Sequence, residues 1–345
     1  MNHRKFFIVT LLLAAVCILI LAALNFAILQ LKFKSDKIFS GIDDREYNSV
    51  IAAKQSFNAA ILGSSMSQGF HCSDLDKAFQ CRSLKLTYSG ANLAEIKFMA
   101  DYAYKFQKID YILLDCHIVN FENTDLSKVP VDYYSSKVTI LLLKKSFSIN
   151  ALEDSRKTIS RYFSGKFKQV SRDDLYDWNL RSSCGEKRIA NAILYQKHPI
   201  LNFDQPFTCK SIENIKKYLV PLLENHKETK FLLFFPPYSV MYYKGNNVSR
   251  YLQFKKEVME LLLKYDNLEL HDFQTEFAIT EKLDNYKDLT HYSGKISQWI
   301  IEHIKLKTHI VTLQNYERYL DKLRDQLLRY DYQAKYDELK IKYKK

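Results

Sequence analysis

The sequence predicts an α/β fold, a three-layer sandwich in which helices cover both faces of a parallel sheet. Short apolar runs bounded by glycine, proline or polar residues have the length of buried strands. Amphipathic helical patterns separate these runs along the chain, and strands that alternate with helices form parallel sheets. Ligands of such sheets bind at the carboxyl ends of the strands, so we expect functional side chains to follow strands.

Five apolar runs have the pattern of strands, and three long amphipathic stretches have the pattern of helices. The expected strands are Ala59–Leu62, Leu84–Tyr88, Tyr111–Val119, Lys230–Phe235 and Leu268–His271. The expected helices are Asn92–Phe106, Ser249–Tyr265 and Gly294–Leu306.

The remaining segments are arranged around one α/β domain, and a length of 345 residues is ample for a core of that size. Leu313, Tyr316, Leu320, Leu323 and Leu327 recur every three or four residues, so the C-terminal segment either packs back on the domain or binds a partner helix. The predicted segments are a short tail (1–5), an apolar helix (6–31), a connector (32–57), the α/β domain (58–306) with a helical insertion (130–229), and a C-terminal charged amphipathic helix (307–345).

Residues 6–31 carry no formal charge and are nearly all apolar. At about 1.5 Å per residue, a helix of this length reaches across a hydrocarbon core of roughly 30 Å. We therefore expect one transmembrane helix, in the inner or plasma membrane. Basic residues flank both of its ends, which weakens the bias that sets orientation. We expect the catalytic domain to be extracytoplasmic, and the opposite orientation is the alternative.

The net charge of +12 comes from lysines scattered along the chain. It indicates either a plain solvated surface or attraction to anionic lipid headgroups or an anionic wall polymer. No nucleic-acid-binding module is recognisable, so we expect no nucleic-acid partner. No cysteine or histidine spacing fits zinc, and we expect neither metal nor cofactor. Either Cys72 with Cys81 or Cys184 with Cys209 could form a disulfide outside the cytoplasm.

The first strand ends at Gly63, and Ser64, Ser65 and Ser67 follow it. A serine on a sharp turn after a strand projects at the sheet edge, and its own N–H can donate to an oxyanion. Ser65 is the candidate nucleophile, and Ser64 and Ser67 compete for that role. Without a base nearby, the same residues would be no more than a helix N-cap.

The candidate base is His291, which follows Asp288 by three residues. A neutral imidazole would take the serine proton and return it, while the carboxylate fixes its tautomer and stabilises the imidazolium. The alternative is a helix N-terminus capped by Asp288 or Thr290. His271 and Asp272 make a poorer pair, because adjacent strand residues point to opposite faces.

These motifs, with Tyr88–Asn92 between them, stand in the order of the four-block SGNH (GDSL-type) hydrolases and resemble them over roughly residues 58–306, and the strand end Phe235–Tyr238 is similar to that of one branch of the family. The resemblance is closest to a membrane-anchored branch that includes the D-alanine transfer proteins of teichoic-acid D-alanylation and surface-glycan O-acylation proteins. It implies an SGNH, flavodoxin-like fold.

The resemblance also implies site residues: Ser65 as nucleophile, Asp288 and His291 as the rest of a triad, and Gly90 as an oxyanion donor. Two blocks depart from the family pattern. Ser64 replaces the usual Asp before the nucleophile, which is tolerable because Asp288 supplies the acid. In place of Gly-x-Asn-Asp the third strand runs into Asp115–Asn120, where Asn120 is the expected oxyanion donor and His117 competes with it.

The sequence therefore predicts a membrane-anchored serine O-acyl esterase or O-acyltransferase that acts through an acyl-enzyme. Its expected substrate is an acylated cell-surface glycan or wall polymer, and its expected partner is an integral membrane acyltransferase. One alternative is a non-catalytic scaffold of the same fold that holds such an acyltransferase or polymer. Another is a lipase or thioesterase that faces the cytoplasm.

Overall fold

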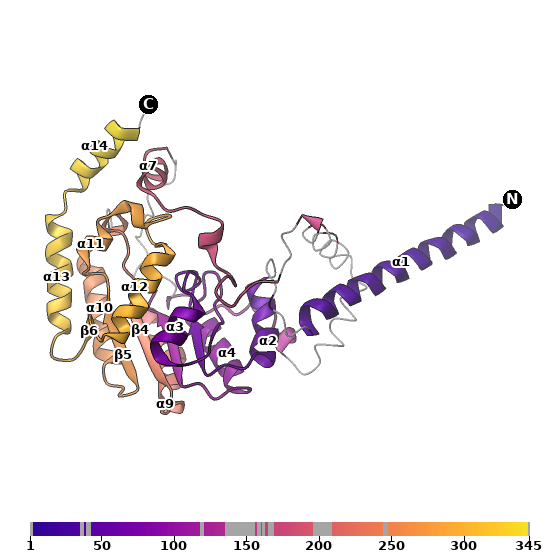
Figure 1. Cartoon of the computed structure of the whole chain (residues 1–345), viewed down its shortest axis with the longest axis horizontal. Helices are drawn as coiled ribbons and strands as arrows, with labels where there is room; N and C mark the ends of the chain where they lie inside the picture. The colour runs from indigo at the N-terminus through magenta and orange to yellow at the C-terminus, as the bar shows by residue number, and fades with distance from the viewer. Residues whose placement is uncertain are drawn as a thin grey trace. The chain divides into compact units, whose positions relative to one another are not determined.

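The computed structural model describes residues 3–34, 38, 43–117, 121–134, 156, 160, 163–164, 169–195, 209–243 and 248–343 (Figure 1). The chain divides into two compact units. One comprises Met1–Gln55 and Ser127–Ser171, and the other comprises Ser56–Leu126 and Arg172–Lys345.

The first unit contains helices α1 (His3–Lys34) and α2 (Asp44–Lys54) and the short helix η2 (Val131–Tyr134). Asp43 caps α2 by accepting a hydrogen bond from the N–H of Arg45 (3.0 Å). The hydroxyl of Tyr134 donates to the carbonyl of Arg45 (2.7 Å), which joins η2 to α2.

Helix α1 covers residues 6–31, where the sequence predicts a transmembrane helix. Its large apolar side chains are exposed at consecutive positions, and so on every side of the helix, from Phe6 (57% exposed) to Leu13 (61% exposed). Within the part of the chain that the structure describes, no helix is both long enough and apolar enough to cross a membrane. The predicted transmembrane helix is therefore not confirmed.

The second unit is built on a six-stranded sheet with the order β2-β1-β3-β4-β5-β6. The strands β1 to β5 are parallel, and their order is the doubly wound, flavodoxin-like one. The predicted α/β class is confirmed. The strands are β1 (Ala59–Leu62), β2 (Ser83–Lys85), β3 (Tyr111–Asp115), β4 (Lys230–Phe235), β5 (Leu268–Asp272) and β6 (Ile310–Val311).

Strand β6 is the exception to the expected parallel sheet, because it runs antiparallel to β5 and pairs Val311 with Leu270. The chain turns back before it, and Lys307 and His309 adopt positive φ angles of 54° and 56°. A strand of only two residues has too short a pattern to be recognised in a sequence.

The helices of this unit form two groups. Helix α3 (Cys72–Phe79) contacts α12 (Gly294–Lys305), and α4 (Leu93–Tyr104) contacts the π-helical turn η4 (Ile215–Leu219). Right-handed crossovers place these groups on opposite faces of the sheet. Burial on both faces explains why every residue of β1 is buried and why its sequence is apolar throughout.

The other helices of the second unit connect its strands or follow them. In the described part of the predicted insertion the helices are short. A capping box formed by Asn92 and Glu95 starts α4, the next helix after β2. The remaining bounds are η3 (Trp178–Leu180), α7 (Glu186–Tyr195), α8 (Cys209–Asn214), α9 (Val220–Asn225), η5 (Val240–Tyr243), α10 (Val248–Leu262), α11 (Phe277–Thr280), η6 (Leu283–Asn285), α13 (Tyr316–Arg329) and α14 (Tyr332–Tyr343).

Two further expectations need correction. The described part of the predicted helix 307–345 forms β6, α13 and α14 instead of a single helix, because the chain leaves helical geometry at Tyr330. The cysteines Cys72, Cys81 and Cys184 are free thiols, so neither of the two suggested disulfides is formed.

The apolar face of α13 packs back on the domain, where α13 lies against α10 in Figure 1. Leu320, Leu323 and Leu327 are buried. The hydroxyl of Tyr316 donates to Glu260 (2.9 Å) beside these leucines. Of the two alternatives for this segment, the structure shows packing on the domain.

We predict that Leu323→Ala lowers the free energy of unfolding by about 2–5 kcal/mol, because it opens a cavity in a fully buried contact. Leu328→Ala in the same helix is the matched control: Leu323 is 0% exposed and Leu328 is 74% exposed. The control should change stability by less than about 0.5 kcal/mol. Equal effects of the two substitutions in chemical denaturation would contradict the packing of α13 on α10.

Candidate active site

The candidate nucleophile lies on a sharp turn that begins where β1 ends. Gly63 has φ +121°, and a Cβ at this position would lie 2.2 Å from Oδ2 of Asp115, so only glycine fits. The chain then makes consecutive turns, closed by hydrogen bonds from the N–H of Ser67 to the carbonyl of Ser64 (3.0 Å) and from the N–H of Gln68 to that of Ser65 (3.3 Å). Helix α3 begins only at Cys72, later than the sequence indicates.

Asp115, the last residue of β3, stabilises this turn through hydrogen bonds. Strands β1 and β3 are neighbours, with Leu62 paired to Leu114, so Asp115 lies beside Gly63. Its buried carboxylate accepts hydrogen bonds from the N–H of Ser64 (2.9 Å), the hydroxyl of Ser64 (3.2 Å) and the hydroxyl of Ser67 (2.6 Å).

These contacts show which of the three candidate serines has a hydroxyl that is available as a nucleophile. The hydroxyls of Ser64 and Ser67 are both bonded to Asp115 and are buried. Burial raises the pKa of Asp115, and the hydrogen bonds from Ser67 and Ser64 act against this rise. Ser65 alone is half-buried, and its hydroxyl is directed away from Asp115 to His291.

The structure brings Ser65, His291 and Asp288 together in one hydrogen-bonded row. Oγ of Ser65 lies 2.8 Å from Nε2 of His291, and Nδ1 of His291 lies 2.8 Å and 3.0 Å from the two carboxylate oxygens of Asp288. A carboxylate can only accept, so Nδ1 carries the proton. The lone pair of Nε2 therefore faces the serine hydroxyl, as a general base requires.

The segment that carries the acid and the base is a closed loop and not the first turn of a helix. An antiparallel bridge joins Tyr286 to Tyr292 across the loop. Oδ1 of Asp288 accepts hydrogen bonds from the N–H groups of Thr290 (3.0 Å) and His291 (2.8 Å). Helix α12 begins after this loop, which excludes the helix N-cap alternative for Asp288.

The same contacts fix the charge of Asp288. Burial by itself would raise the pKa of this carboxyl group. The hydrogen bond and the charge of His291, with the N–H groups of His291 and Thr290, outweigh burial and lower the pKa well below its usual range. Asp288 is therefore ionised at neutral pH and can stabilise a protonated His291.

Trp178 is a residue of the site that sequence reasoning missed. Its Nε1–H donates to the carbonyl of Ser65 (3.1 Å), and its ring meets the ring of His291 edge-on, with centroids 5.4 Å apart. The ammonium group of Lys287 lies 4.7 Å from the Trp178 ring. A tryptophan in the 130–229 insertion belongs to no recognisable motif, so no sequence signal pointed to it.

The sequence predicts that the backbone N–H groups of Ser65 and Gly90 are the oxyanion donors. Gly90 has φ +64° in a turn closed by the hydrogen bond from the N–H of Ala91 to the carbonyl of Tyr88 (3.1 Å). The bond from Gln68 to Ser89 (3.0 Å) ties this turn to the segment that follows Ser65. Among the described residues, no group accepts from the N–H of Ser65 or of Gly90. Asn120, the expected side-chain donor, lies outside the described residues.

The other acid–histidine pair has separate structural partners. His271 is bonded to Glu269 (3.0 Å) and to the carbonyl of Thr308 (2.8 Å), whereas Asp272 is bonded to the buried Lys255 (2.6 Å). His271 and Asp272 therefore form no dyad. No group of three or more histidine, cysteine or acidic side chains that could hold a metal ion occurs in the described ranges.

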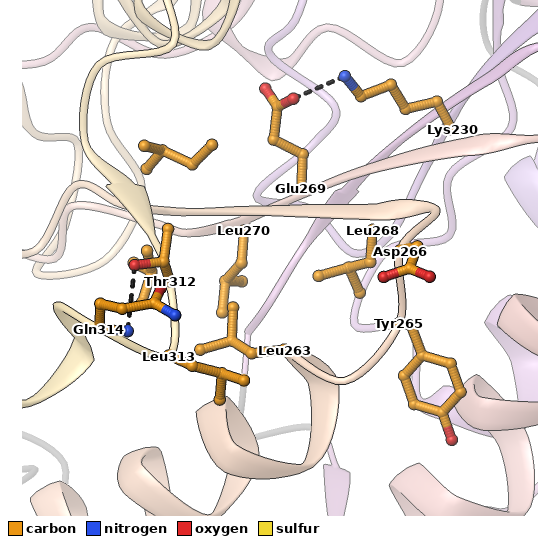
Figure 2. Close-up of a pocket in the computed structure, with 12 residues that line it drawn as sticks. Lys230, Leu263, Tyr265, Asp266, Leu268, Glu269, Leu270, Thr312, Leu313 and Gln314 are labelled. Atoms are coloured by element: carbon orange, nitrogen blue, oxygen red, sulfur yellow. Dashed lines mark hydrogen bonds and ion pairs between the residues drawn. The ribbon is translucent and has the colours of Figure 1, made fainter.

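A cavity of about 300 Å³ lies beside β5 and β6 (Figure 2). Its lining includes Lys230 and Leu268, the first residues of β4 and β5, and an ion pair between Lys230 and Glu269 (2.6 Å). The candidate nucleophile follows the carboxyl end of a parallel strand, so this cavity lies at the opposite end of the sheet. It takes no part in the site.

We predict that Asp115→Ala lowers kcat for a small acyl ester by about 100-fold, because the turn that positions Ser65 loses three hydrogen bonds. Asp115→Asn, which keeps the volume and one acceptor, should lose less. The control is Asp110→Ala, just before the other end of β3, where the side chain accepts from Asn58 (2.8 Å). Wild-type kcat in a folded Asp115→Ala protein would contradict this role of Asp115.

Comparisons with known proteins add little. No family model matches the chain, and no curated protein matches it. One solved structure, from Streptococcus pneumonia and provisionally described as a platelet activating factor, is similar with a TM-score of 0.38 and 11% identity, over 76% of this chain and 89% of that chain. The function proposed below rests on the geometry of the site and not on this similarity.

Proposed function

We propose that the chain is a serine acyl-transfer enzyme, an ester hydrolase or O-acyltransferase. Ser65 is the nucleophile, His291 the general base, and Asp288 the residue that orients the base. The single observation that carries the proposal is the unbroken row of contacts, 2.8 Å from Ser65 to His291 and 2.8 Å from His291 to Asp288. A nucleophile, a base and an orienting acid in hydrogen-bond reach of one another are the parts of nucleophilic acyl transfer.

In the first half of the reaction, Nε2 of His291 takes the proton of Ser65 as Oγ attacks the acyl carbonyl carbon. The N–H groups of Ser65 and Gly90 stabilise the negative oxygen of the tetrahedral intermediate. The intermediate collapses, the bond to the leaving alcohol breaks, and His291 gives its proton to that alcohol. An ester between the acyl group and Ser65 remains.

In the second half, a hydroxyl compound or water attacks the acyl-enzyme while His291 again takes a proton. Collapse of the second intermediate returns that proton to Ser65 and releases the new ester or the acid. Hydrolase and transferase use the same residues, and the acceptor decides between them. The proposed acceptor is a cell-surface glycan or wall polymer; the family resemblance of the motifs and the net charge of +12 support an anionic polymer.

We predict that a fluorophosphonate labels the wild-type chain and that labelling is lost in Ser65→Ala and in His291→Ala. Ser67→Ala is the matched control: it removes one of the three bonds to Asp115, so it should still take the label, although more slowly than the wild type. Asp288→Asn, which favours the wrong tautomer of His291, should lower kcat on the order of 10⁴-fold. A well-folded chain that takes no label would favour the non-catalytic scaffold that holds an acyltransferase or polymer.

We further propose that α1 attaches the chain to a membrane, with the catalytic domain on the extracytoplasmic side, near an integral membrane acyltransferase. The exposed apolar side chains from Phe6 to Leu13 support attachment, because contact of so large an apolar surface with water is unfavourable and burial in lipid removes it. The side of the membrane and the acyltransferase rest on the sequence alone.

We predict that the full chain stays in the membrane pellet after an alkaline carbonate wash and that a chain without residues 1–34 is released. Recovery of the full chain in the soluble fraction would contradict attachment. Protease added to intact cells should cut the domain if it is extracytoplasmic, and complete protection would place it in the cytoplasm.

A further inference from the structure

A second histidine, His117, lies beside the proposed triad without a role in it. It follows β3 by two residues, at the carboxyl edge of the sheet where Ser65 follows β1. Leu114 and Leu62 are register partners, and His117 and Ser65 each lie three residues beyond them. The charges of both His291 and Asp288 act on the His117 ring, which agrees with this register.

Tyr238 fixes the tautomer of this histidine. Oη of Tyr238 lies 2.6 Å from Nδ1 of His117, and the two rings meet edge-on with centroids 5.6 Å apart. Tyr238 follows β4 in the segment Phe235–Tyr238 and is fully buried. Burial raises its pKa well above the ordinary value, so the phenol keeps its proton.

The phenol proton has one acceptor among the described residues, Nδ1 of His117. A buried hydroxyl that donated nowhere would be left with an unsatisfied proton, so Tyr238 donates and Nδ1 accepts. The neutral imidazole then carries its hydrogen on Nε2. Within the described ranges this N–H has no acceptor.

The charge state of His117 is equally restricted. Burial and the charge of His291 lower the pKa of His117 to about 3, although the charge of Asp288 acts in the opposite direction. A histidine with so low a pKa is neutral around neutral pH. It can donate a hydrogen bond, but it neither adds a positive charge to the site nor competes for the serine proton.

We infer that Nε2–H of His117 is the side-chain donor of the oxyanion hole and that Tyr238 is the residue that positions it. The inference rests on the proposed function and completes its donor set. A carbonyl oxygen that becomes negative during attack by Ser65 would accept from the N–H groups of Ser65 and Gly90 and from His117. His117 thus takes the role of side-chain oxyanion donor that the sequence predicts for Asn120.

The test is kcat and KM for p-nitrophenyl acetate in the full chain and in His117→Ala, His117→Gln and Tyr238→Phe. Removal of one oxyanion donor costs about 10²–10³-fold in kcat, so His117→Ala should lose that much with little change in KM. His117→Gln should recover most of the loss, since its amide N–H can donate from about the same place. Tyr238→Phe should fall between the wild type and His117→Ala, because both tautomers of His117 become populated.

The pH profile separates a donor from a second base. With a pKa of about 3, His117 loses its neutral form only as the pH falls far below the neutral range. His117→Gln should therefore keep the acid limb of the wild-type kcat/KM profile. Loss of that limb would show that His117 titrates in the active range and would overturn the inference.

The other outcomes are also decisive. Wild-type kcat in His117→Ala, with Ser65→Ala inactive, would overturn the inference and leave the proposed function standing. Equal loss in His117→Ala and His117→Gln, at an unchanged melting temperature, would show that a donated hydrogen bond is not what the site needs. A wild-type chain with no esterase activity and no fluorophosphonate label would end the proposed function and the inference together.

Discussion

The hydrogen bond between Ser65 and His291 is the contact on which the proposed site depends. It joins two loops that are 226 residues apart in the sequence, at a distance of 2.8 Å. Neither loop could hold this geometry by itself. The serine turn is fixed by the close approach of Gly63 to Asp115, and the histidine loop by the bridge between Tyr286 and Tyr292. The sheet supplies the common frame, because parallel strands end at one edge.

Two aspartates at this edge of the sheet have different roles. Asp115 is buried among hydroxyl and N–H donors, and burial raises its pKa. Asp288 is bonded to His291, and that bond and charge overcome burial and lower its pKa. The first aspartate positions the backbone that carries the nucleophile, and the second fixes the tautomer of the base. Environments that shift two carboxyl groups in opposite directions are typical of sites in which the two groups have separate tasks.

The sequence predicted the fold and the principal residues where patterns are local. The strands Ala59–Leu62 and Lys230–Phe235 have the predicted bounds, since both are buried on two faces and are apolar throughout. Strand β6 was not predicted, because two residues are too few to show a strand periodicity. The turn before it depends on positive φ angles at non-glycine residues. The third predicted strand, Tyr111–Val119, was drawn too long, as β3 ends at Asp115.

Residues that act through tertiary contacts were beyond the reach of sequence patterns. Trp178 reaches Ser65 from an insertion, and Tyr238 reaches His117 from the neighbouring strand end. Each role depends on a neighbour more than 100 residues away in the chain, at separations of 113 and 121 positions. By contrast, Asp288 and His291 could be paired in advance, because three residues of one tight loop suffice to bring them together.

The most direct test of the central claim is to trap the acyl-enzyme. The chain is mixed with p-nitrophenyl acetate and quenched within the first turnover, and the acetyl group is then located by mass spectrometry of the peptides. We expect a burst of one nitrophenolate per chain and an acetyl group on Ser65. An acetyl group on Ser64, Ser67 or any other side chain, or turnover without a covalent intermediate, would contradict the account.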